Sequence, residues 1–236
     1  MLSEEHVPAE NCLLATLPRE DRQHFLSGCE QVELVLGQIL CEPQQRIRHV
    51  YFPIDCFISL MTPIDQHSSL EVALVGSEGM FGIPIMLGVD VTSLHAVVQG
   101  SGHAWRMDVE RFHSELKHCV GLQQELNRYI YVLMIQLAQT AACTRFHVVE
   151  ERLARWLLMM RDRAHSNAFH ITHEFLAHML GVRRVGVTKA AGSLQKKKLI
   201  SYSRGDVRIN DIAGLEAASC SCYRADKETY ERILRL

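Results

Sequence analysis

The stretch that decides the fold spans residues 171–209 and reads ITHEFLAHMLGVRRVGVTKAAGSLQKKKLISYSRGDVRI. Thr172 can cap a first helix, whose apolar residues recur at helical spacing until Gly181 supplies a sharp turn. A second, cationic helix follows over residues 183–198, and residues 199–209 have the pattern of a two-stranded hairpin. This order predicts a winged helix-turn-helix, whose second helix is shaped to enter the major groove of DNA.

The distribution of charge favours nucleic acid as the partner of this module. Residues 1–144 hold 8 of the 25 Lys and Arg and 17 of the 27 Asp and Glu, a balance of −9. Residues 145–236 hold the other 17 basic and 10 acidic residues, a balance of +7. The split indicates a cationic module that meets phosphates, joined to an acidic module with another task. A chance asymmetry between two solvated surfaces would give the same count, and paired helices with a glycine turn also occur outside DNA-binding proteins.

The preceding residues predict a different architecture. Residues 30–107 contain short strands separated by glycine-bearing turns, which is typical of a small barrel or jelly roll. A long helix is expected over about 120–143 and another over 148–163. At 236 residues the chain has room for two modest domains with separate cores. The predicted fold class is therefore α+β: an N-terminal β jelly roll, a long helix and a C-terminal winged helix-turn-helix.

The long helix carries an apolar seam. Its members lie four and three residues apart and are Leu126, Ile130, Leu133 and Leu137. Two such helices could pair through the seam as a short coiled coil. The same spacing also fits a helix that packs on its own roll, so the seam alone does not decide between the two.

Several motifs resemble the Crp–Fnr family of bacterial transcription regulators. They are LEVALVGSEGMFG at 70–82, VEERLARWLL at 149–158 and LGVRR at 180–184, followed by Val187 and Thr188. The resemblance covers essentially the whole chain. It implies an effector-sensing, cyclic-nucleotide-binding-like roll over 1–118, a dimerisation helix over 119–146 and a DNA-binding domain over 147–236. It further implies a homodimer whose effector repositions the two reading helices, and it adds RNA polymerase to the candidate partners.

The resemblance also assigns DNA contacts. The recognition helix of the family commonly presents an arginine, a glutamate and a second basic residue to base edges. Arg184 matches the arginine and Lys189 the second basic residue, whereas Val185 stands in place of the acid and could touch a thymine methyl. Arg183 is expected to read a base or to hold a phosphate. The expected phosphate contacts are Thr188, Ser193, Lys196 and the wing residue Arg204.

The effector site departs from the family pattern. Cyclic-nucleotide-binding members use a Gly-Glu-Leu-type turn for the ribose and a later Arg-Ser-Ala segment for the phosphate. The corresponding positions here are Gly82, Ile83, Pro84, Ile85, Thr92 and Ser93. Ile83 replaces the carboxylate and Thr92 replaces the arginine, which removes the main charge-assisted contact with phosphate. We therefore expect no cyclic AMP binding of the usual kind. The turn either takes an uncharged effector, whose identity the sequence does not give, or is filled by its own side chains.

The cysteines give no clear cofactor signature. Cys12, Cys29, Cys41 and Cys56 are too widely spread for an iron–sulfur cluster, and isolated histidines indicate no haem site. Cys220 and Cys222 lie close together in the sequence, separated only by Ser221. No companion ligands are evident in the sequence, so no metal site is predicted and the role of this segment stays open.

Other classes of protein are disfavoured. No apolar run reaches the roughly 20 residues of a membrane helix, and the acidic N-terminus lacks a signal-peptide pattern, so a cytoplasmic protein with reduced thiols is expected. No cupin-like metal spacing, nucleophile elbow or phosphate loop occurs, which predicts a protein that is not an enzyme. The alternative to a DNA-binding regulator is an effector-sensing protein that acts through protein contacts, with a degenerate helix-turn-helix.

Overall fold

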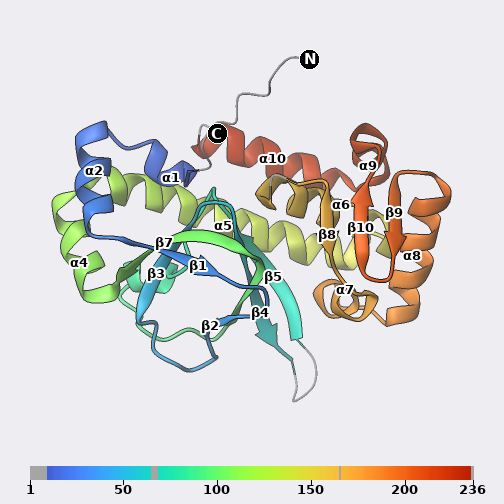
Figure 1. The fold of residues 1–236 in the computed structure, drawn as a ribbon, viewed down its shortest axis with the longest axis horizontal. Helices are drawn as coiled ribbons and strands as arrows, with labels where there is room; N and C mark the ends of the chain where they lie inside the picture. Colours follow the sequence, from blue (N-terminus) through green and yellow to red (C-terminus); the bar gives the residue numbers. More distant parts are fainter. Residues whose placement is uncertain (1–9, 65–68, 165, 235–236) are drawn as a thin grey trace.

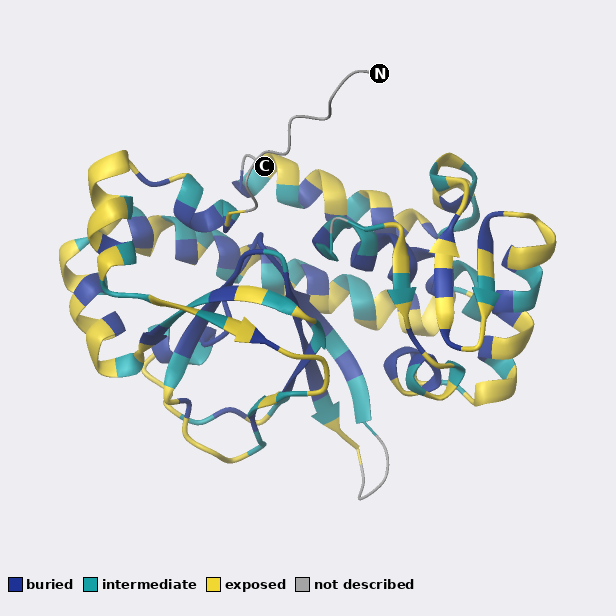
Figure 2. Ribbon diagram, in the orientation of Figure 1, coloured by how far each residue is buried: buried dark blue, intermediate teal, exposed yellow. Residues whose placement is uncertain are grey.

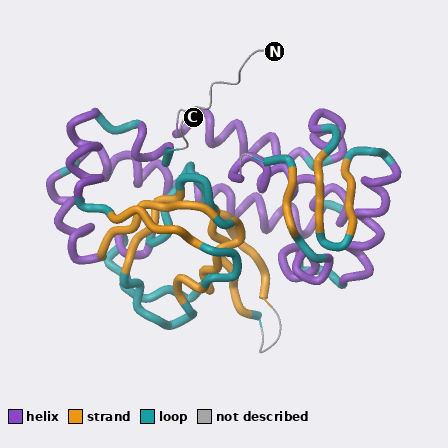
Figure 3. The backbone as a smooth tube through the Cα atoms, viewed as in Figure 1, coloured by secondary structure: helices purple, strands orange, loops and turns teal. Residues whose placement is uncertain are grey.

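The computed structural model describes residues 10–64, 69–164 and 166–234. A β roll lies at the left of Figure 1, a small hairpin with its helices lies at the right, and the long helix α5 (Val120–Phe146) runs behind both. The two groups of strands are separate (Figure 3). The predicted α+β order of roll, long helix and winged helix-turn-helix is therefore confirmed.

The described strands of the roll form two antiparallel sheets. One sheet has the order β1-β7-β3, with bounds Glu30–Leu34, Gly102–Asp108 and His49–Pro53. The other has the order β2-β6-β4-β5, with bounds Ile39–Cys41, His95–Gly100, Phe57–Pro63 and Ser69–Val75. A single apolar core lies between them and includes Val50, Phe52, Ile58 and Val98. Burial of both inner faces explains why these strands are rich in branched and aromatic residues.

Four short helices in the described part of the chain accompany the strands of the roll. They are α1 (Cys12–Ala15), α2 (Arg19–Ser27), α3 (Ile83–Met86) and α4 (Val109–His118). Pro18, with an extended ψ of 145°, precedes α2 and separates it from α1. Asp108 begins α4, because its carboxylate accepts hydrogen bonds from the backbone N–H groups of Glu110 and Arg111.

Helix α5 has an inner and an outer face. Leu126 and Tyr129 are fully buried against the roll core, whereas Met134 is 61% exposed and Tyr131 is 49% exposed. Leu126 belongs to the seam that the sequence offers for pairing, yet it contacts its own roll because one face of the helix must cover that core. Ile130 and Leu133 are half-buried, and Leu137 is exposed. The outer apolar face is thus displaced around the helix from the predicted seam.

The C-terminal module consists of helices packed on one small sheet. Its helices are α6 (Val149–Ala164), α7 (His173–Leu180), α8 (Arg184–Lys196), α9 (Ile212–Ala218) and α10 (Ser221–Leu234). Its sheet has the order β8-β10-β9, with bounds Ala168–His170, Asp206–Ile209 and Ile200–Ser203. The hairpin β9–β10 is the predicted wing, and β8 adds a third strand to it.

The roll and the C-terminal module share a core. Phe57 and Leu74 of the roll belong to the same buried cluster as Trp156 of α6 and Met179 of α7. Within this contact Glu71 of β5 accepts hydrogen bonds from Trp156 Nε1 at 2.7 Å and from Ser59 Oγ at 2.6 Å. A carboxyl group therefore lies inside an otherwise apolar junction.

None of the described helices is both long enough and apolar enough to cross a membrane.

The buried carboxyl predicts a pH dependence of stability. Burial raises the pKa of Glu71 to about 7 from an ordinary value of 4.5. Between these values the native protein holds a proton that the unfolded chain has lost, so stability falls as the pH rises through this window and is constant above it. Glu71→Gln, which keeps the shape and the Trp156 acceptor, should flatten this window and stabilise the protein at about pH 8 by about 1–3 kcal/mol.

Urea unfolding of wild type and Glu71→Gln at several pH values between about 4.5 and 8 measures this effect. Equal pH dependence in the two proteins would show that burial does not raise the pKa of Glu71 in the native state.

Candidate nucleic-acid interface

The turn between α7 and α8 is built by local sequence. Thr172 Oγ1 accepts a hydrogen bond from the backbone N–H of Phe175 at 3.2 Å and caps α7. Gly181 ends the helix in the left-handed region, with φ of 60°. The inner face of α8 is buried against α6 and α7 through Val187, Ala190, Ala191 and Leu194. These contacts fix which face of α8 remains free.

The free face of α8 carries the residues expected to contact DNA. Arg184, Thr188, Lys189 and Lys196 are exposed, and Val185 is 58% exposed (Figure 2). Val185 is an apolar side chain exposed to water on a cationic helix. Its exposure is unfavourable in the free protein and would be relieved by contact with a bound molecule. The face combines a guanidinium group, an apolar branch and ammonium groups, which suits a base edge flanked by phosphates.

The N-terminus of α8, a fully described helix, carries two arginines and no acidic residue in its first turn. Arg183 is the N-cap residue and makes no side-chain capping bond, and Arg184 is the first residue of the helix. The helix dipole places partial positive charge at this end, so two guanidinium groups there are unfavourable until an anion arrives. A phosphate would satisfy both the free N–H groups and the arginines.

The wing places a further cation beside this helix. The β9–β10 hairpin turns at Arg204 and Gly205, both with positive φ, of 52° and 95°. Such values match a two-residue hairpin turn, in which a non-glycine residue at the first position is strained. Arg204 is exposed at the tip. The strand β8 pairs with β10 behind it, and its three residues carry no pattern that would have revealed it.

Thr188 is held within the module. Its Oγ1 lies 3.1 Å from the carbonyl oxygen of Arg184 and 3.1 Å from His173 Nδ1. The His173 ring stacks on Tyr202 of the wing, with 4.3 Å between ring centroids. Burial, together with the charge of Arg184, lowers the pKa of His173 below its ordinary value and so favours the neutral ring. This chain of contacts joins α7, α8 and the wing, and the sequence did not single out His173 or Tyr202.

Ser193 differs from the other expected phosphate contacts because it is half-buried. Hydrogen bonds from Lys197 and Ser193 lower the pKa of Glu150, and Lys197 Nζ lies 2.6 Å from Glu150 Oε1. Ser193 therefore faces the first turn of α6, and Lys197 is already paired. The exposed cations of α8, its flanking residues and the wing include Arg183, Arg184, Lys189, Lys196, Lys198, Arg204 and Arg208.

Three arginines that enter the positive charge balance are buried. Arg155 pairs with Asp226 of α10 at 2.6 Å, Arg163 pairs with Glu78 of the roll at 2.9 Å, and Arg152 donates to a backbone carbonyl of α7. The interpretation of the whole excess of +7 as a surface for phosphates is therefore wrong for these residues. The exposed cationic side chains of α8 and the wing remain as the expected surface for phosphates.

The turn that would correspond to a nucleotide site is packed with its own side chains. Ile83 and Ile85 are buried members of the roll core. Gly82 has φ of 110°, and a Cβ there would lie 2.7 Å from Val50, so glycine is required for both reasons. Thr92 is buried, and its hydroxyl accepts a hydrogen bond from the N–H of Leu94 at 3.0 Å. Pro84 is half-buried and Ser93 is exposed.

A cavity of about 260 Å³ lies elsewhere, between the roll and the C-terminal helices. Its walls include Glu78, Met159, Arg163, Tyr223 and Tyr230. The cavity therefore adjoins the ion pair that joins the roll to α6.

Seven of the eight cysteines fall into two groups, and Cys119 lies apart from both at the N-terminus of α5. Cys12, Cys29, Cys41 and Cys56 contact different groups: Ser77 and the backbone carbonyl oxygens of residues 25, 45 and 103. Near the C-terminus the finding differs from the expectation. The expectation of no companion ligands for Cys220 and Cys222 is wrong, because Cys143 and His147 lie beside them.

Comparison with known proteins agrees with this architecture. Residues 151–218 match the Crp-like helix-turn-helix domain. No curated protein matches the chain in sequence. Among solved structures, a protein assigned to the Crp/Fnr regulators from Eubacterium rectale has a TM-score of 0.67 at 17% identity, covering 87% of this chain and 96% of its own.

Two further structures are similar. FixK2 from Bradyrhizobium japonicum has a TM-score of 0.68 at 12% identity, over 81% of this chain and 98% of its own. The c-di-GMP-responsive global regulator CLP from Xanthomonas campestris has a TM-score of 0.66 at 15% identity, over 81% and 99%.

These likenesses define the class of protein. The chain has the fold of the Crp/Fnr transcription regulators, and residues 151–218 are a Crp-like helix-turn-helix domain. The resemblance inferred from the sequence is thereby confirmed.

Proposed function

We propose that the protein is a homodimeric, sequence-specific DNA-binding transcription regulator. The observation that carries this proposal is the exposed face of α8 in a Crp-like helix-turn-helix domain. At its N-terminus Arg183 and Arg184 are exposed and form no ion pair with the described residues. Each subunit places α8 in one major groove, and the two half-sites lie about one helical turn, roughly 34 Å, apart. RNA polymerase stays a candidate partner of the DNA-bound dimer.

Base reading is assigned to the first turn of α8. Arg184 donates to a guanine, Val185 packs on a thymine methyl, and Lys189 reads or supports a neighbouring base. Arg183, Thr188, Lys196 and Arg204 hold phosphates around this contact, and Ser193 does so only if its bond to Glu150 opens. The wing and the end of α8 then bracket one half-site.

The dimer forms through the outer face of α5. Its exposed apolar members are Tyr131, Met134 and Leu137; the half-buried Ile130 and Leu133, which also pack on the roll core, lie at its edge. A run of this kind on a helix of 27 residues fits pairing of two parallel helices, whereas Leu126 is reserved for the roll. Pairing here would place the two C-terminal modules side by side for a two-fold symmetric site.

The roll is proposed to sense an effector other than cyclic AMP. The buried Ile83 and Thr92 offer no carboxylate or guanidinium group for a cyclic nucleotide. If an effector binds at residues 82–85 and 92–93, these side chains must first move out of the core. The cavity beside Glu78 and Arg163 is apolar in most of its lining and offers an alternative place.

The competing function is action through protein contacts alone. It predicts no selective binding to any duplex, whereas the proposed regulator retains particular sequences. Selection of fragments from a random DNA pool by the purified protein, at about 150 mM salt, separates the two.

Arg184→Ala should relax specificity at one base pair in each half-site. The loss of a bidentate contact costs about 1–3 kcal/mol at that position and little on random DNA. Fluorescence anisotropy with single-base operator variants measures this. Arg184→Lys is the matched control, since it keeps the charge but loses the fork geometry and should also relax specificity. Equal loss on operator and random DNA would exclude a base-reading role.

Lys196→Ala should weaken binding to all sequences almost equally. One phosphate contact is lost in each subunit, so the slope of log affinity against log salt should become shallower by about 0.9 for each subunit. The exposed Lys227 on α10 supplies the control variant Lys227→Ala, which should leave the slope unchanged. A sequence-dependent effect of Lys196→Ala would assign this residue to the bases instead.

Met134→Glu should break the dimer. Two carboxylates would face each other across an apolar interface, which costs several kcal/mol. Sedimentation velocity at micromolar protein should show a dimer for wild type and for the conservative variant Met134→Leu, and a monomer for Met134→Glu. A wild-type monomer, or a dimeric Met134→Glu, would place the interface elsewhere.

A further inference from the structure

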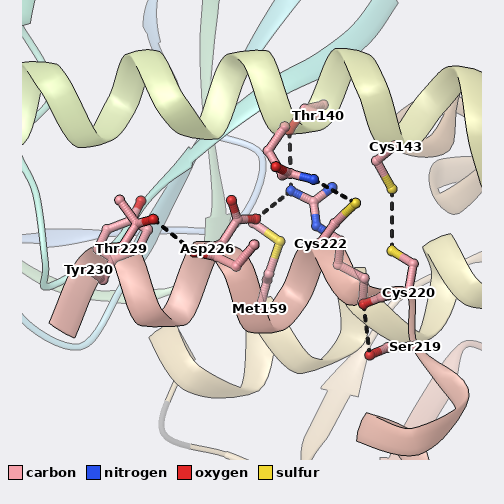
Figure 4. A network of polar contacts seen from close by, with 12 residues as sticks. Thr140, Cys143, Met159, Ser219, Cys220, Cys222, Asp226, Thr229 and Tyr230 are labelled. Carbon is pink, nitrogen blue, oxygen red and sulfur yellow. Dashed lines mark hydrogen bonds and ion pairs between the residues drawn. The ribbon is translucent and has the colours of Figure 1, made fainter. Parts of the chain in front are cut away.

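Four side chains converge where the long helix ends. Cys143 lies in the last turn of α5, and His147 is the residue that caps it. Cys220 directly precedes α10, and Cys222 lies in its first turn. Their ligand atoms, three sulfurs and one imidazole nitrogen, all lie within 4.8 Å of one another. Residues from two distant parts of the sequence therefore meet at one point, as Figure 4 shows for the cysteines.

The distances fit a tetrahedron around a single ion. Cys143 Sγ lies 3.5 Å from Cys220 Sγ, and Cys222 Sγ lies 3.4 Å from His147 Nδ1. With zinc–sulfur bonds of about 2.3 Å and zinc–nitrogen bonds of about 2.0 Å, tetrahedral ligands stand about 3.8 Å apart for two sulfurs and about 3.5 Å for sulfur and nitrogen. These two separations differ from the tetrahedral values by a few tenths of an ångström, and the remaining pairs, all within 4.8 Å, need to close by at most about 1 Å.

The surroundings suit a thiolate site. The cysteines are buried, with exposed fractions of 1% for Cys143, 5% for Cys220 and 1% for Cys222. Gln139 Nε2 donates a hydrogen bond to Cys222 Sγ at 2.8 Å. The charges of Arg152 and Arg155 act on Cys143 and Cys220. Three thiolates and a divalent ion carry a net charge of −1, which these guanidinium groups offset.

We propose that Cys143, His147, Cys220 and Cys222 bind one zinc-class divalent ion. All four positions are filled by protein, which is the arrangement of a structural site and leaves no open position for a substrate. The ion ties the start of α10 to the end of α5, at the junction with α6. It thereby fixes the connection between the long helix and the DNA-reading module.

A disulfide is the competing use of the same sulfurs. It would join Cys143 and Cys220, whose sulfur atoms would have to approach from 3.5 Å to about 2.05 Å. It would leave Cys222 and His147 without a role. The convergence of all four groups favours the ion.

Metal analysis of the purified full-length protein tests the proposal. We expect about one zinc per chain by mass spectrometry of the metal, and cobalt in its place should give the visible bands of a tetrahedral thiolate complex. Cys143→Ser and Cys222→Ser should lose most of the bound metal, whereas Cys119→Ser, at the other end of α5, should keep it. No metal, metal retained by both variants, or a Cys143–Cys220 disulfide in the intact protein would overturn the proposal.

A second variant guards against misfolding of the cysteine mutants. Gln139→Ala removes only the hydrogen bond to Cys222 and should lower zinc affinity about 10- to 100-fold in competition with a chromophoric chelator. A strong chelator should also lower the melting temperature of wild type but not that of Cys222→Ser. Unchanged affinity in Gln139→Ala together with no chelator effect would contradict the site. These measurements use no DNA, so their outcome is independent of the proposed function.

Discussion

The burial of helix α6 is the constraint on which the rest of the molecule depends. Its residues 152–160 are all buried, and the guanidinium groups of Arg152, Arg155 and Arg163 lie inside the protein. A buried charge without a partner costs several kcal/mol, so each arginine must meet an acceptor. The acceptors come from different places: Glu78 of the roll for Arg163, Asp226 of α10 for Arg155, and a carbonyl of α7 for Arg152. Helix α6 is therefore bonded to the roll, to the C-terminal helix α10 and to helix α7 of the helix-turn-helix.

These buried contacts limit how a ligand bound to the roll could move α8. Helix α8 packs on α6, so the reading face cannot turn relative to the roll unless a buried partner of α6 is exchanged or moved with it. The Glu71–Trp156 bond adds a second polar contact across the same junction. An effector changes DNA affinity only if it binds the two arrangements with different free energies. The cavity beside Glu78 and Arg163 lies against α6, so a ligand bound there would contact the ion pair between the roll and this helix.

Local patterns predicted local structure well. Thr172, Gly181 and the turn at Arg204 and Gly205 lie where the sequence indicates, because each conformation depends on a few neighbouring residues. What depended on distant residues was not visible. The charge count could not separate Arg155, which is buried, from Arg184, which is exposed. A periodic seam could not show that Leu126 turns inward while Met134 turns outward.

The cysteine cluster shows the same limit. The spacing of Cys143 and His147 brings both onto one side of a helix end, and that signal was present in the sequence. Its completion depends on α10 running antiparallel to α5, with Cys222 beside Gln139 and Tyr230 beside Tyr129. Helix α5 therefore has three neighbours: the roll along its inner face, a second subunit along its proposed outer face, and α10 along its remaining side. A bond that fixes α10 to the end of α5 also positions Asp226, because this residue lies on α10. Asp226 in turn forms the ion pair with Arg155 of α6. An ion at this point would act on the same buried charges that orient the reader, although it lies outside both the sensor and the DNA-binding surface.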